Sequence, residues 1–243
     1  MAGSGFGTNF RITTWGETHG AGVGVVVDGC PAGLPLERED VQKYLDRRKP
    51  GQSKYTTQRK EGDQVEILSG IFEGRTTGTP ISMVVYNKDQ RSKDYSNIKD
   101  IYRPGHADFT FDMKYGFRDY RGGGRSSGRE TIGRVAEGAV AAKVLKELGI
   151  EIKAYAKAIA GIEVSKDHFD FAEMNNNPFN MPDKEAAKLV QEKADQMIKE
   201  MDSIGGIIEC QITGMPVGIG ETVFDKLDAE LSKAIMSIGS VKG

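Results

Sequence analysis

The spacing of apolar residues along the chain predicts a protein of mixed strands and helices. A short β-branched run, 23–28, predicts a buried strand that ends at Gly29. Two further strands are expected at 65–68 and 81–86, separated by a turn region rich in Gly and Thr. Apolar residues at helical spacing predict three helices, at 37–48, 130–148 and 184–201. The pattern therefore predicts a chain that contains both strands and helices.

The predicted helix 130–148 follows a long stretch without periodicity. Between 86 and 129 the chain is rich in Arg, Gly, Asp and Tyr, and long irregular stretches in compact domains are often functional. Within the helix, Gly133 and Gly138 favour close packing on more than one side, and Gly149 is expected to cap its end.

Two similar strand–turn–helix segments, here called the internal echo, favour a duplicated architecture. The strand 23–28 precedes Gly29-Cys30-Pro31-Ala32-Gly33, and a strand expected at 207–213 precedes Gly214-Met215-Pro216-Val217-Gly218. A predicted helix follows each turn, the second at about 224–236. Gly-x-Pro-x-Gly alone is ordinary turn chemistry, but its place between a strand and a helix in both copies favours two related halves.

Composition narrows the class of protein. The 243 residues include 33 basic and 35 acidic side chains, and 38% are hydrophobic, which is ordinary for a globular protein in water. We expect a single domain over 1–243, with no membrane span and no export signal, and hence a cytoplasmic protein. Cys30 and Cys210 are isolated, which argues against a disulfide framework. The 31 glycines are nearly twice the usual share of about 7%, so we expect tight turns and close approaches to ligands.

Two histidines lie in Gly-flanked turns. His19 belongs to Gly16-Glu17-Thr18-His19-Gly20, and His106 to Tyr102-Arg103-Pro104-Gly105-His106-Ala107-Asp108. Each is placed to transfer a proton near neutral pH, although each could equally serve only to hydrogen-bond a turn. His168 lies in a polar stretch and is expected at the surface. Three histidines without paired spacing give no support to a metal site.

A glycine-rich segment precedes the helix 130–148. In Arg121-Gly122-Gly123-Gly124-Arg125-Ser126-Ser127-Gly128-Arg129, backbone N–H groups can converge, and Ser126 or Ser127 can cap the helix. With Arg125 and Arg129 nearby, the segment favours phosphate binding, and the alternative is a flexible linker. The spacing matches neither a P-loop nor a dinucleotide-binding fingerprint.

A basic segment supplies a competing hypothesis. Residues 47–60 are strongly basic with one aromatic residue, which would suit an RNA backbone. The chain is net acidic and stacking aromatics are sparse, so a small anionic ligand is favoured over nucleic acid.

Taken together, these segments resemble the chorismate synthase family. The resemblance runs from Phe10 to Gly243 and rests on several motifs in order: Trp15-Gly16-Glu17-Thr18-His19-Gly20, Leu45-Asp46-Arg47-Arg48-Lys49-Pro50-Gly51-Gln52-Ser53, Tyr55-Thr56-Thr57-Gln58-Arg59, Tyr102-Arg103-Pro104-Gly105-His106-Ala107-Asp108, Asp119-Tyr120-Arg121-Gly122-Gly123-Gly124-Arg125-Ser126-Ser127 and Met236-Ser237-Ile238. Each motif alone is weak, but their order is highly specific, and it favours functional roles for both turn histidines.

The resemblance implies an α+β fold, namely a β-α-β sandwich with internal duplication. It also implies a homotetramer and a carbon–oxygen lyase that eliminates phosphate in the anti 1,4 sense from 5-enolpyruvylshikimate 3-phosphate, giving chorismate in the shikimate pathway. Reduced FMN would be needed without net redox change, and NADPH would enter only indirectly, as a reductant of the flavin.

The resemblance also implies residue roles. Substrate anions would be bound by Arg48, Lys54 and Arg129. His19, beside Thr18, would protonate the departing phosphate, and His106 would stabilise protonation of the reduced flavin. FMN would be held by Arg125, Ser126, Ser127, Gly239 and Ser240.

This chain departs from the family pattern at a few positions. Thr18 stands where Ser is usual and keeps the hydroxyl, whereas Lys54 replaces an Arg fork by a point charge. Gly128 is often Ala in the family, and Gly239-Ser240 is often Asn-Ala or Pro-Ala, which bears on the flavin contacts. Relatives continue for about half as many residues again, with a further Asp and much of the FMN phosphate site there. We therefore expect that this chain lacks those parts, and that alone it would be aggregation-prone or loosely folded, bind FMN weakly and not turn over.

Overall fold

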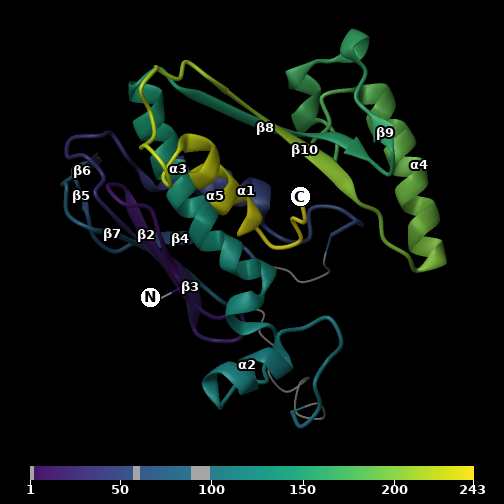
Figure 1. Ribbon diagram of the computed structural model, residues 1–243, viewed down its shortest axis with the longest axis horizontal. Coiled ribbons are helices and arrows are strands. Elements are labelled where there is room, and N and C mark those ends of the chain that lie inside the picture. Colours follow the sequence, from purple (N-terminus) through teal and green to yellow (C-terminus); the bar gives the residue numbers. More distant parts are fainter. Residues whose placement is uncertain (1–2, 57–60, 89–98) are drawn as a thin grey trace. The chain divides into compact units, whose positions relative to one another are not determined.

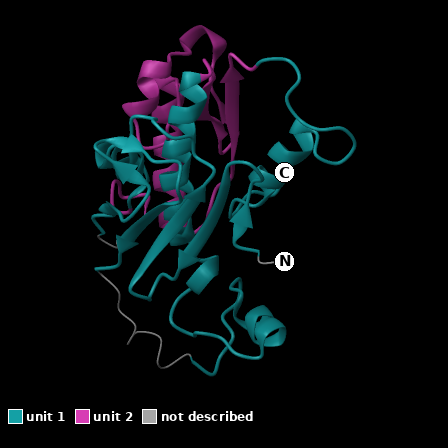
Figure 2. Ribbon diagram, turned by 90° about the vertical axis from the view of Figure 1, so that its left-hand side faces the viewer, with its two compact units in different colours: residues 1–49, 60–147, 216–243 teal, residues 50–59, 148–215 magenta. Residues whose placement is uncertain are grey.

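The computed structural model describes residues 3–56, 61–88 and 99–243, which group into two compact units. Unit 1 comprises residues 1–49, 60–147 and 216–243, and unit 2 comprises residues 50–59 and 148–215 (Figure 2). Each unit is described by itself. That residues 1–243 form one domain stays a prediction.

Unit 1 is built on a five-stranded antiparallel sheet. Its strands run in the order β1–β2–β3–β7–β4 and span Gly5–Phe6, Arg11–Gly16, Gly22–Asp28, Ile81–Tyr86 and Val65–Ile67 respectively. Burial alternates along β2, where Ile12 and Thr14 are buried between exposed neighbours, as expected for a sheet covered on one face. The predicted strands at 23–28, 65–68 and 81–86 are confirmed as β3, β4 and β7.

Helices α1 (Arg38–Arg48) and α3 (Thr131–Glu147) pack on that sheet and against each other (Figure 1). Both were expected from apolar periodicity. Fully buried side chains from the sheet and the helices form the core of the unit, among them Val25, Leu45, Met83 and Val140. At Gly133 an added Cβ would lie 3.0 Å from Thr14 Cγ2 and 3.1 Å from the Gly24 carbonyl oxygen, so a glycine lets α3 approach the sheet closely.

The prediction of close packing on more than one side of α3 holds at Gly133 but not at Gly138. A Cβ added at Gly138 would meet no described atom within 4 Å.

The stretch 86–129 contains a helix that the sequence pattern did not indicate. α2 (Asp108–Tyr115) has one buried residue, Asp108, and ends at Gly116 in the left-handed conformation. Two 3₁₀ turns, η2 (Gly124–Ser126) and η3 (Gly128–Glu130), then lead into α3. The remaining elements of unit 1 are the short pair β5 (Ile71–Phe72) and β6 (Arg75–Thr76) and the helix α5 (Leu227–Met236).

Unit 2 contains a three-stranded antiparallel sheet and one long helix. The sheet runs β10–β8–β9, spanning Gly206–Thr213, Glu151–Ile159 and Ile162–Glu163, and the helix is α4 (Lys184–Glu200). Short 3₁₀ turns lie at Lys166–His168 and Phe171–Asn175. Asp183 caps α4 by accepting hydrogen bonds from the N–H groups of Glu185 and Ala186. As predicted, α4 is amphipathic, with Ala187 and Val190 buried and its charged residues outward.

The turns of the internal echo share one backbone conformation. Gly29, Gly33, Gly214 and Gly218 all have positive φ. A Cβ at Gly29 would lie 1.8 Å from the Asn9 carbonyl oxygen, and one at Gly214 would lie 2.0 Å from the Gly149 carbonyl oxygen, so both positions require glycine. A strand precedes and a helix follows each turn, as predicted, although the second helix begins at Leu227 rather than at about 224.

The structure also bears on the expectations about membrane spans and disulfides. No helix in the described parts of the chain has the length and apolar character needed to cross a bilayer. Cys30 is buried and Cys210 exposed, and both are free thiols.

Candidate active site

A buried carboxylate joins two arginines from different elements. The Asp63 side chain has no exposed surface, and each of its oxygens accepts a hydrogen bond from a different guanidinium. Arg129 Nη1, from η3, lies 2.9 Å from Oδ1, and Arg48 Nη1, from the end of α1, lies 2.7 Å from Oδ2. Arg48 also donates to Thr131 Oγ1 and to the Gly128 carbonyl, which ties α1 to the start of α3. Two cations and one anion thus leave this cluster with a net positive charge.

Asn87, just after β7, connects this cluster to the turn that carries Thr18 and His19. Its Oδ1 accepts hydrogen bonds from Arg129 Nε at 3.1 Å and Nη2 at 2.9 Å. Its Nδ2 donates to the carbonyl oxygens of Glu17 and Gly20, both at 2.9 Å. One amide therefore fixes the orientation of Arg129 and closes the 17–20 turn.

The 17–20 turn packs on the glycine-rich segment. Thr18 is buried, and its hydroxyl donates to the Gly124 carbonyl at 3.3 Å. His19 lies against Gly122, where an added Cβ would stand 2.4 Å from Cδ2 and 2.8 Å from Nε2 of the imidazole. Gly122 also has φ of +73°, so both its conformation and its contact with the ring require glycine.

A small pocket of about 40 Å³ lies beside this contact. Among the residues that line it are Glu17, His106, Asp119, Gly122 and Ser126. His106 is exposed, and its Nδ1 lies 3.0 Å from the Pro104 carbonyl oxygen. The two turn histidines, far apart in sequence, thus come to one region of unit 1: His106 lines the pocket, and His19 packs on a glycine that lines it.

Arginines set the charge of two carboxylates of the pocket. The Arg121 guanidinium, hydrogen-bonded to Asp119, holds the pKa of that carboxyl below its ordinary value, and a positive charge on His19 acts in the same direction. Asp108 is buried and accepts from Arg103 Nε and Nη2, both at 2.8 Å. Arg103 keeps the pKa of Asp108 far below its usual range, so this carboxylate is ionised and anchors the 103–108 turn.

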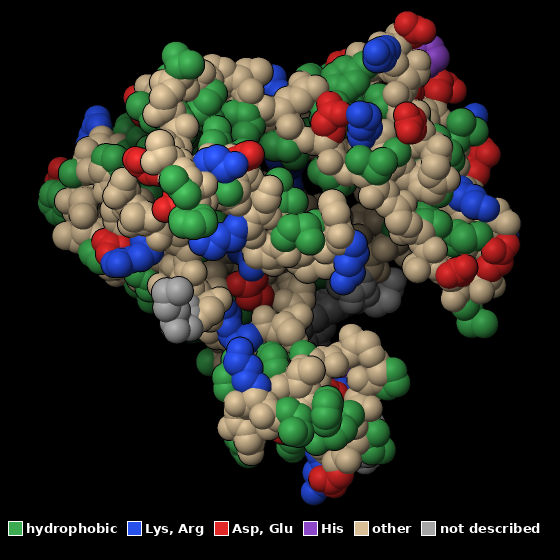
Figure 3. Space-filling view, viewed as in Figure 1, with side chains coloured by type: hydrophobic (Ala, Val, Ile, Leu, Met, Phe, Trp, Pro, Cys, Tyr) green, Lys and Arg blue, Asp and Glu red, His purple; other side chains and the backbone are tan. Residues whose placement is uncertain are grey.

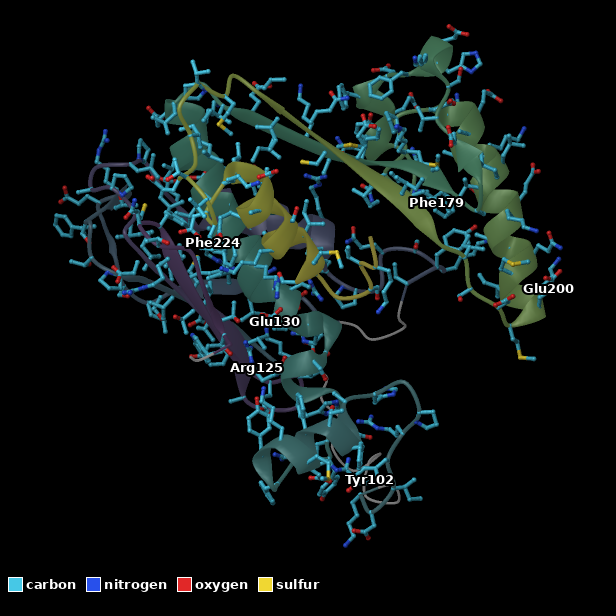
Figure 4. The ribbon with its side chains drawn as sticks, in the orientation of Figure 1. Tyr102, Arg125, Glu130, Phe179, Glu200 and Phe224 are labelled. Atoms are coloured by element: carbon cyan, nitrogen blue, oxygen red, sulfur yellow. The ribbon has the colours of Figure 1, made fainter. Side chains whose placement is uncertain are left out.

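The three predicted flavin residues of the glycine-rich segment point in different directions. Arg125 turns back to β2, donating to Thr14 Oγ1 at 2.6 Å and to the Thr14 and Gly16 carbonyls. Figure 4 shows Arg125 near Glu130, at the start of α3. Ser127 Oγ accepts from the Arg129 N–H and caps η3, as the sequence predicted for one of the two serines. Ser126 lines the pocket, with its hydroxyl donating to the Gly123 carbonyl.

The other predicted site residues belong to other segments of the chain. Lys54 belongs to unit 2, where its Nζ lies 2.7 Å from Asp195 Oδ1. The hydrogen bond to Asp195 raises the pKa of Lys54. Gly239 and Ser240 lie after α5 and are exposed, and Ser240 has a left-handed backbone with φ of +71°.

Comparison with known proteins identifies the family of this chain. The family model for chorismate synthase matches residues 10–243. The chain belongs to the chorismate synthase family. It is 70% identical over its whole length to the chorismate synthase of Lachnospira eligens and 57% identical to that of Chloroflexus aggregans. In each case it spans 66% of the relative's length.

A solved structure of this family agrees with the fold. A chain described as a crystal structure of chorismate synthase superposes with a TM-score of 0.77 at 31% sequence identity, covering 97% of this chain and 67% of that one. The predicted family and the α+β fold class are therefore confirmed.

Two residues of the chorismate synthase-like site were not predicted from the sequence. Asp63 and Asn87 lie outside the motifs that carried the resemblance, and neither follows an apolar period. The only signal for Asn87 is its position directly after a predicted strand, where polar side chains gather at a sheet edge. In the described ranges, with 57–60 and 89–98 set aside, no group of three or more His, Cys, Asp or Glu side chains could hold a metal ion.

Proposed function

We propose that the protein acts as a chorismate synthase, a carbon–oxygen lyase that eliminates phosphate from 5-enolpyruvylshikimate 3-phosphate in the shikimate pathway. The observation that supports this most is the Arg48–Asp63–Arg129 cluster, tied through Asn87 to the turn of His19. A substrate with one phosphate and two carboxylates needs fixed cationic donors, and the departing phosphate needs a proton. The cluster supplies the first, and the neighbouring imidazole supplies the second.

In this proposal each named side chain has one task. The Arg48 side chain is 19% exposed and that of Arg129 6%, so Arg48 is the more accessible of the two cations and is proposed as the main substrate contact. His19 donates the proton to the leaving phosphate, and Thr18 holds the turn through its bond to Gly124. His106, exposed beside the pocket, would stabilise protonation of a bound reduced flavin. Lys54 is the third substrate cation that the resemblance implies.

Residues of unit 1 partly fit a flavin. Ser126 and the glycine backbone line a pocket beside His106, and both offer polar groups to a bound cofactor. Arg125 holds this segment against β2, because its guanidinium donates hydrogen bonds to the Thr14 hydroxyl and carbonyl. FMN contacts are therefore proposed for Ser126, which lines the pocket, and, on the family resemblance, for Ser127, Gly239 and Ser240. When bound, reduced FMN would supply electron density for the elimination without net redox change, and NADPH would serve only as its reductant.

We further propose that the protein works in the cytoplasm as a homotetramer, as the family resemblance implies. Its partner is then a small anionic substrate rather than a nucleic acid or a membrane.

The test is phosphate release by the protein at its full natural length. Under anaerobic conditions, with reduced FMN and 5-enolpyruvylshikimate 3-phosphate, inorganic phosphate and chorismate are expected in equal amounts. The same mixture with oxidised FMN should release none. Arg48→Ala should raise KM for the substrate, while Ser127→Ala should mainly weaken FMN binding or the cap, the latter by about 1 kcal/mol. Absence of phosphate release with reduced FMN would contradict the proposal.

A further inference from the structure

Asp63 occupies an unusual position for a carboxylate. It has no exposed surface, and its backbone is in the left-handed region, with φ of +42°. Such a conformation is costly for a residue with a side chain and persists where the surroundings hold it in place. The surroundings here are two guanidinium groups, one on each carboxylate oxygen. A buried charge that is paired on both sides is stable, whereas removing it would leave two buried like charges next to each other.

Asn87 holds the second end of the same cluster. Together, Asp63 and Asn87 receive hydrogen bonds from Arg129 Nε, Nη1 and Nη2, which fixes the plane of that guanidinium. A guanidinium has five N–H donors in a rigid fork, so a fixed plane sets the direction of the donors left for a ligand. The Nδ2 group of Asn87 also holds the carbonyls on either side of Thr18 and His19.

We propose that Asp63 and Asn87 are positioning residues of this site. Asp63 orients Arg48 and Arg129 for an anionic group of the substrate, and Asn87 fixes Arg129 relative to the turn of His19. The expected effect on substrate binding rests on the proposed function. The expected effect on the orientation of the two arginines rests on the observed contacts alone, so each effect has its own test.

The first test needs no activity. Phenylglyoxal modifies accessible guanidinium groups, and peptide mass spectrometry gives the rate at each arginine in the protein at its full natural length. Asp63→Asn should raise the rate several-fold at both Arg48 and Arg129, because a charged acceptor is lost. Asn87→Ala should raise it at Arg129 and leave Arg48 unchanged. Asp28→Asn is the matched control, since Asp28 pairs with Arg11 instead, outside this cluster. Unchanged rates in Asp63→Asn would overturn the positioning role.

The second test separates binding from turnover. Charge-assisted hydrogen bonds contribute about 1.5–3 kcal/mol, so Asp63→Asn should raise the substrate Kd and KM by about 10- to 100-fold and change kcat less. Asn87→Ala should lower kcat as well, because the turn of His19 loses two hydrogen bonds. Asp63→Glu, which keeps the charge, should recover part of the loss and serves if Asp63→Asn does not fold. If the wild-type protein releases no phosphate, the proposed function fails while the modification rates still decide this inference. If it does and Asp63→Asn binds substrate as tightly as wild type, this inference fails alone.

Discussion

At the scale of single residues, the contact between Gly122 and His19 makes a sharp prediction. Gly122→Ala should push the imidazole away, since the new Cβ would stand 2.4 Å from its Cδ2. Gly116→Ala is the control: its φ of +70° is nearly that of Gly122, at +73°, but an added Cβ there meets no described atom within 4 Å. Both substitutions should cost about 1–2 kcal/mol of stability from the left-handed backbone.

Only Gly122→Ala should lower kcat, by tenfold or more, because general acid–base groups contribute about 10²–10⁴-fold. Steady-state kinetics and urea unfolding of both variants give the comparison. Equal kcat in the two variants would show that the position of His19 does not matter for turnover.

His106 allows a second residue-scale prediction. It is exposed, so His106→Ala should change the free energy of unfolding by less than about 0.5 kcal/mol. As the proposed stabiliser of the protonated flavin it should still lower turnover by about 10²–10⁴-fold. His168→Ala, an exposed histidine of unit 2, is the matched control and should leave turnover unchanged. Near wild-type turnover of His106→Ala at saturating reduced FMN would remove it from the site.

Only some residues of the candidate site can be predicted from the local sequence. Both histidines were singled out because a titratable ring between small residues is chemically distinctive. Asp63 and Asn87 were not, because Asp and Asn are common in loops and their importance comes from partners far along the chain. Arg125 was expected to face the flavin, but its nearest acceptors are on β2. Nothing in local sequence distinguishes an arginine that binds a ligand from one that supports the backbone beneath it.

At the scale of elements, alanine substitutions at two glycines of α3 should have different effects on stability. Gly138→Ala should stabilise the protein by about 0.5–1 kcal/mol, since Ala is the better helix former and the added methyl meets no described atom. Gly133→Ala should gain less or lose stability, because its methyl would press on Thr14 and the Gly24 carbonyl. Thermal unfolding of the two variants gives the comparison. A higher Tm for Gly133→Ala than for Gly138→Ala would show that α3 does not approach the sheet as closely as described.

Glu137, also on α3, predicts a pH dependence of stability. It borders a pocket of about 510 Å³ together with Phe6, Ile12, Arg134 and Lys233, and burial raises its pKa to about 7, with Arg134 opposing that shift. The folded state then binds more protons than the unfolded state between about pH 4.5 and pH 7. This carboxyl therefore contributes a loss of stability as the pH rises through that window.

Glu137→Gln should remove that loss. The variant should be more stable than wild type at pH 8 by about 1–3 kcal/mol and differ little at pH 4.5. Urea unfolding at both pH values measures it, with Glu147→Gln, an exposed carboxylate of the same helix, as the control for lost charge. A gain of equal size at both pH values would contradict burial as the cause.

Elements with a clear apolar period were predicted from the sequence, whereas elements without such a period, which depend on contacts with other parts of the chain, were not. β3, α1 and α4 have dense apolar patterns and were found within two residues of their ends. β8 was missed because its Glu, Lys and Ala residues have low strand propensity and its stability comes from pairing with β10 along its length. α2 was missed because it buries only Asp108, so no apolar stripe marks it.

At the scale of the whole molecule, the echoed glycine turns were the most reliable guide to architecture. Their conformation is dictated locally, by a carbonyl that leaves no room for a Cβ, so a single sequence can indicate them. The division into two units was not predicted. The chain passes between units at 49/50, 59/60, 147/148 and 215/216, and no composition shift marks these points.

Charge distribution favours a small anionic substrate over a nucleic acid. Figure 3 shows basic and acidic side chains interspersed on the face in view. The described part of the basic segment that suggested RNA binding is largely engaged within the protein: Arg48 with Asp63, Lys49 with Asp46, and Lys54 with Asp195. Its residues 57–60 lie outside the described part. With 33 basic and 35 acidic residues, the molecule has no excess of cations for counterion release from a phosphate backbone.

We therefore predict no measurable binding of the protein to a single-stranded RNA of about 20 nucleotides at about 50 mM salt, where electrostatic binding is favoured. Fluorescence anisotropy of a labelled RNA is the measurement, with a strongly basic RNA-binding protein as the positive control. Binding that weakens steeply with salt and is lost in Arg47→Ala and Arg48→Ala would reverse the assignment. In the enzyme proposal Arg48 stays hydrogen-bonded to Asp63, and a small anion that enters the site takes its remaining donors.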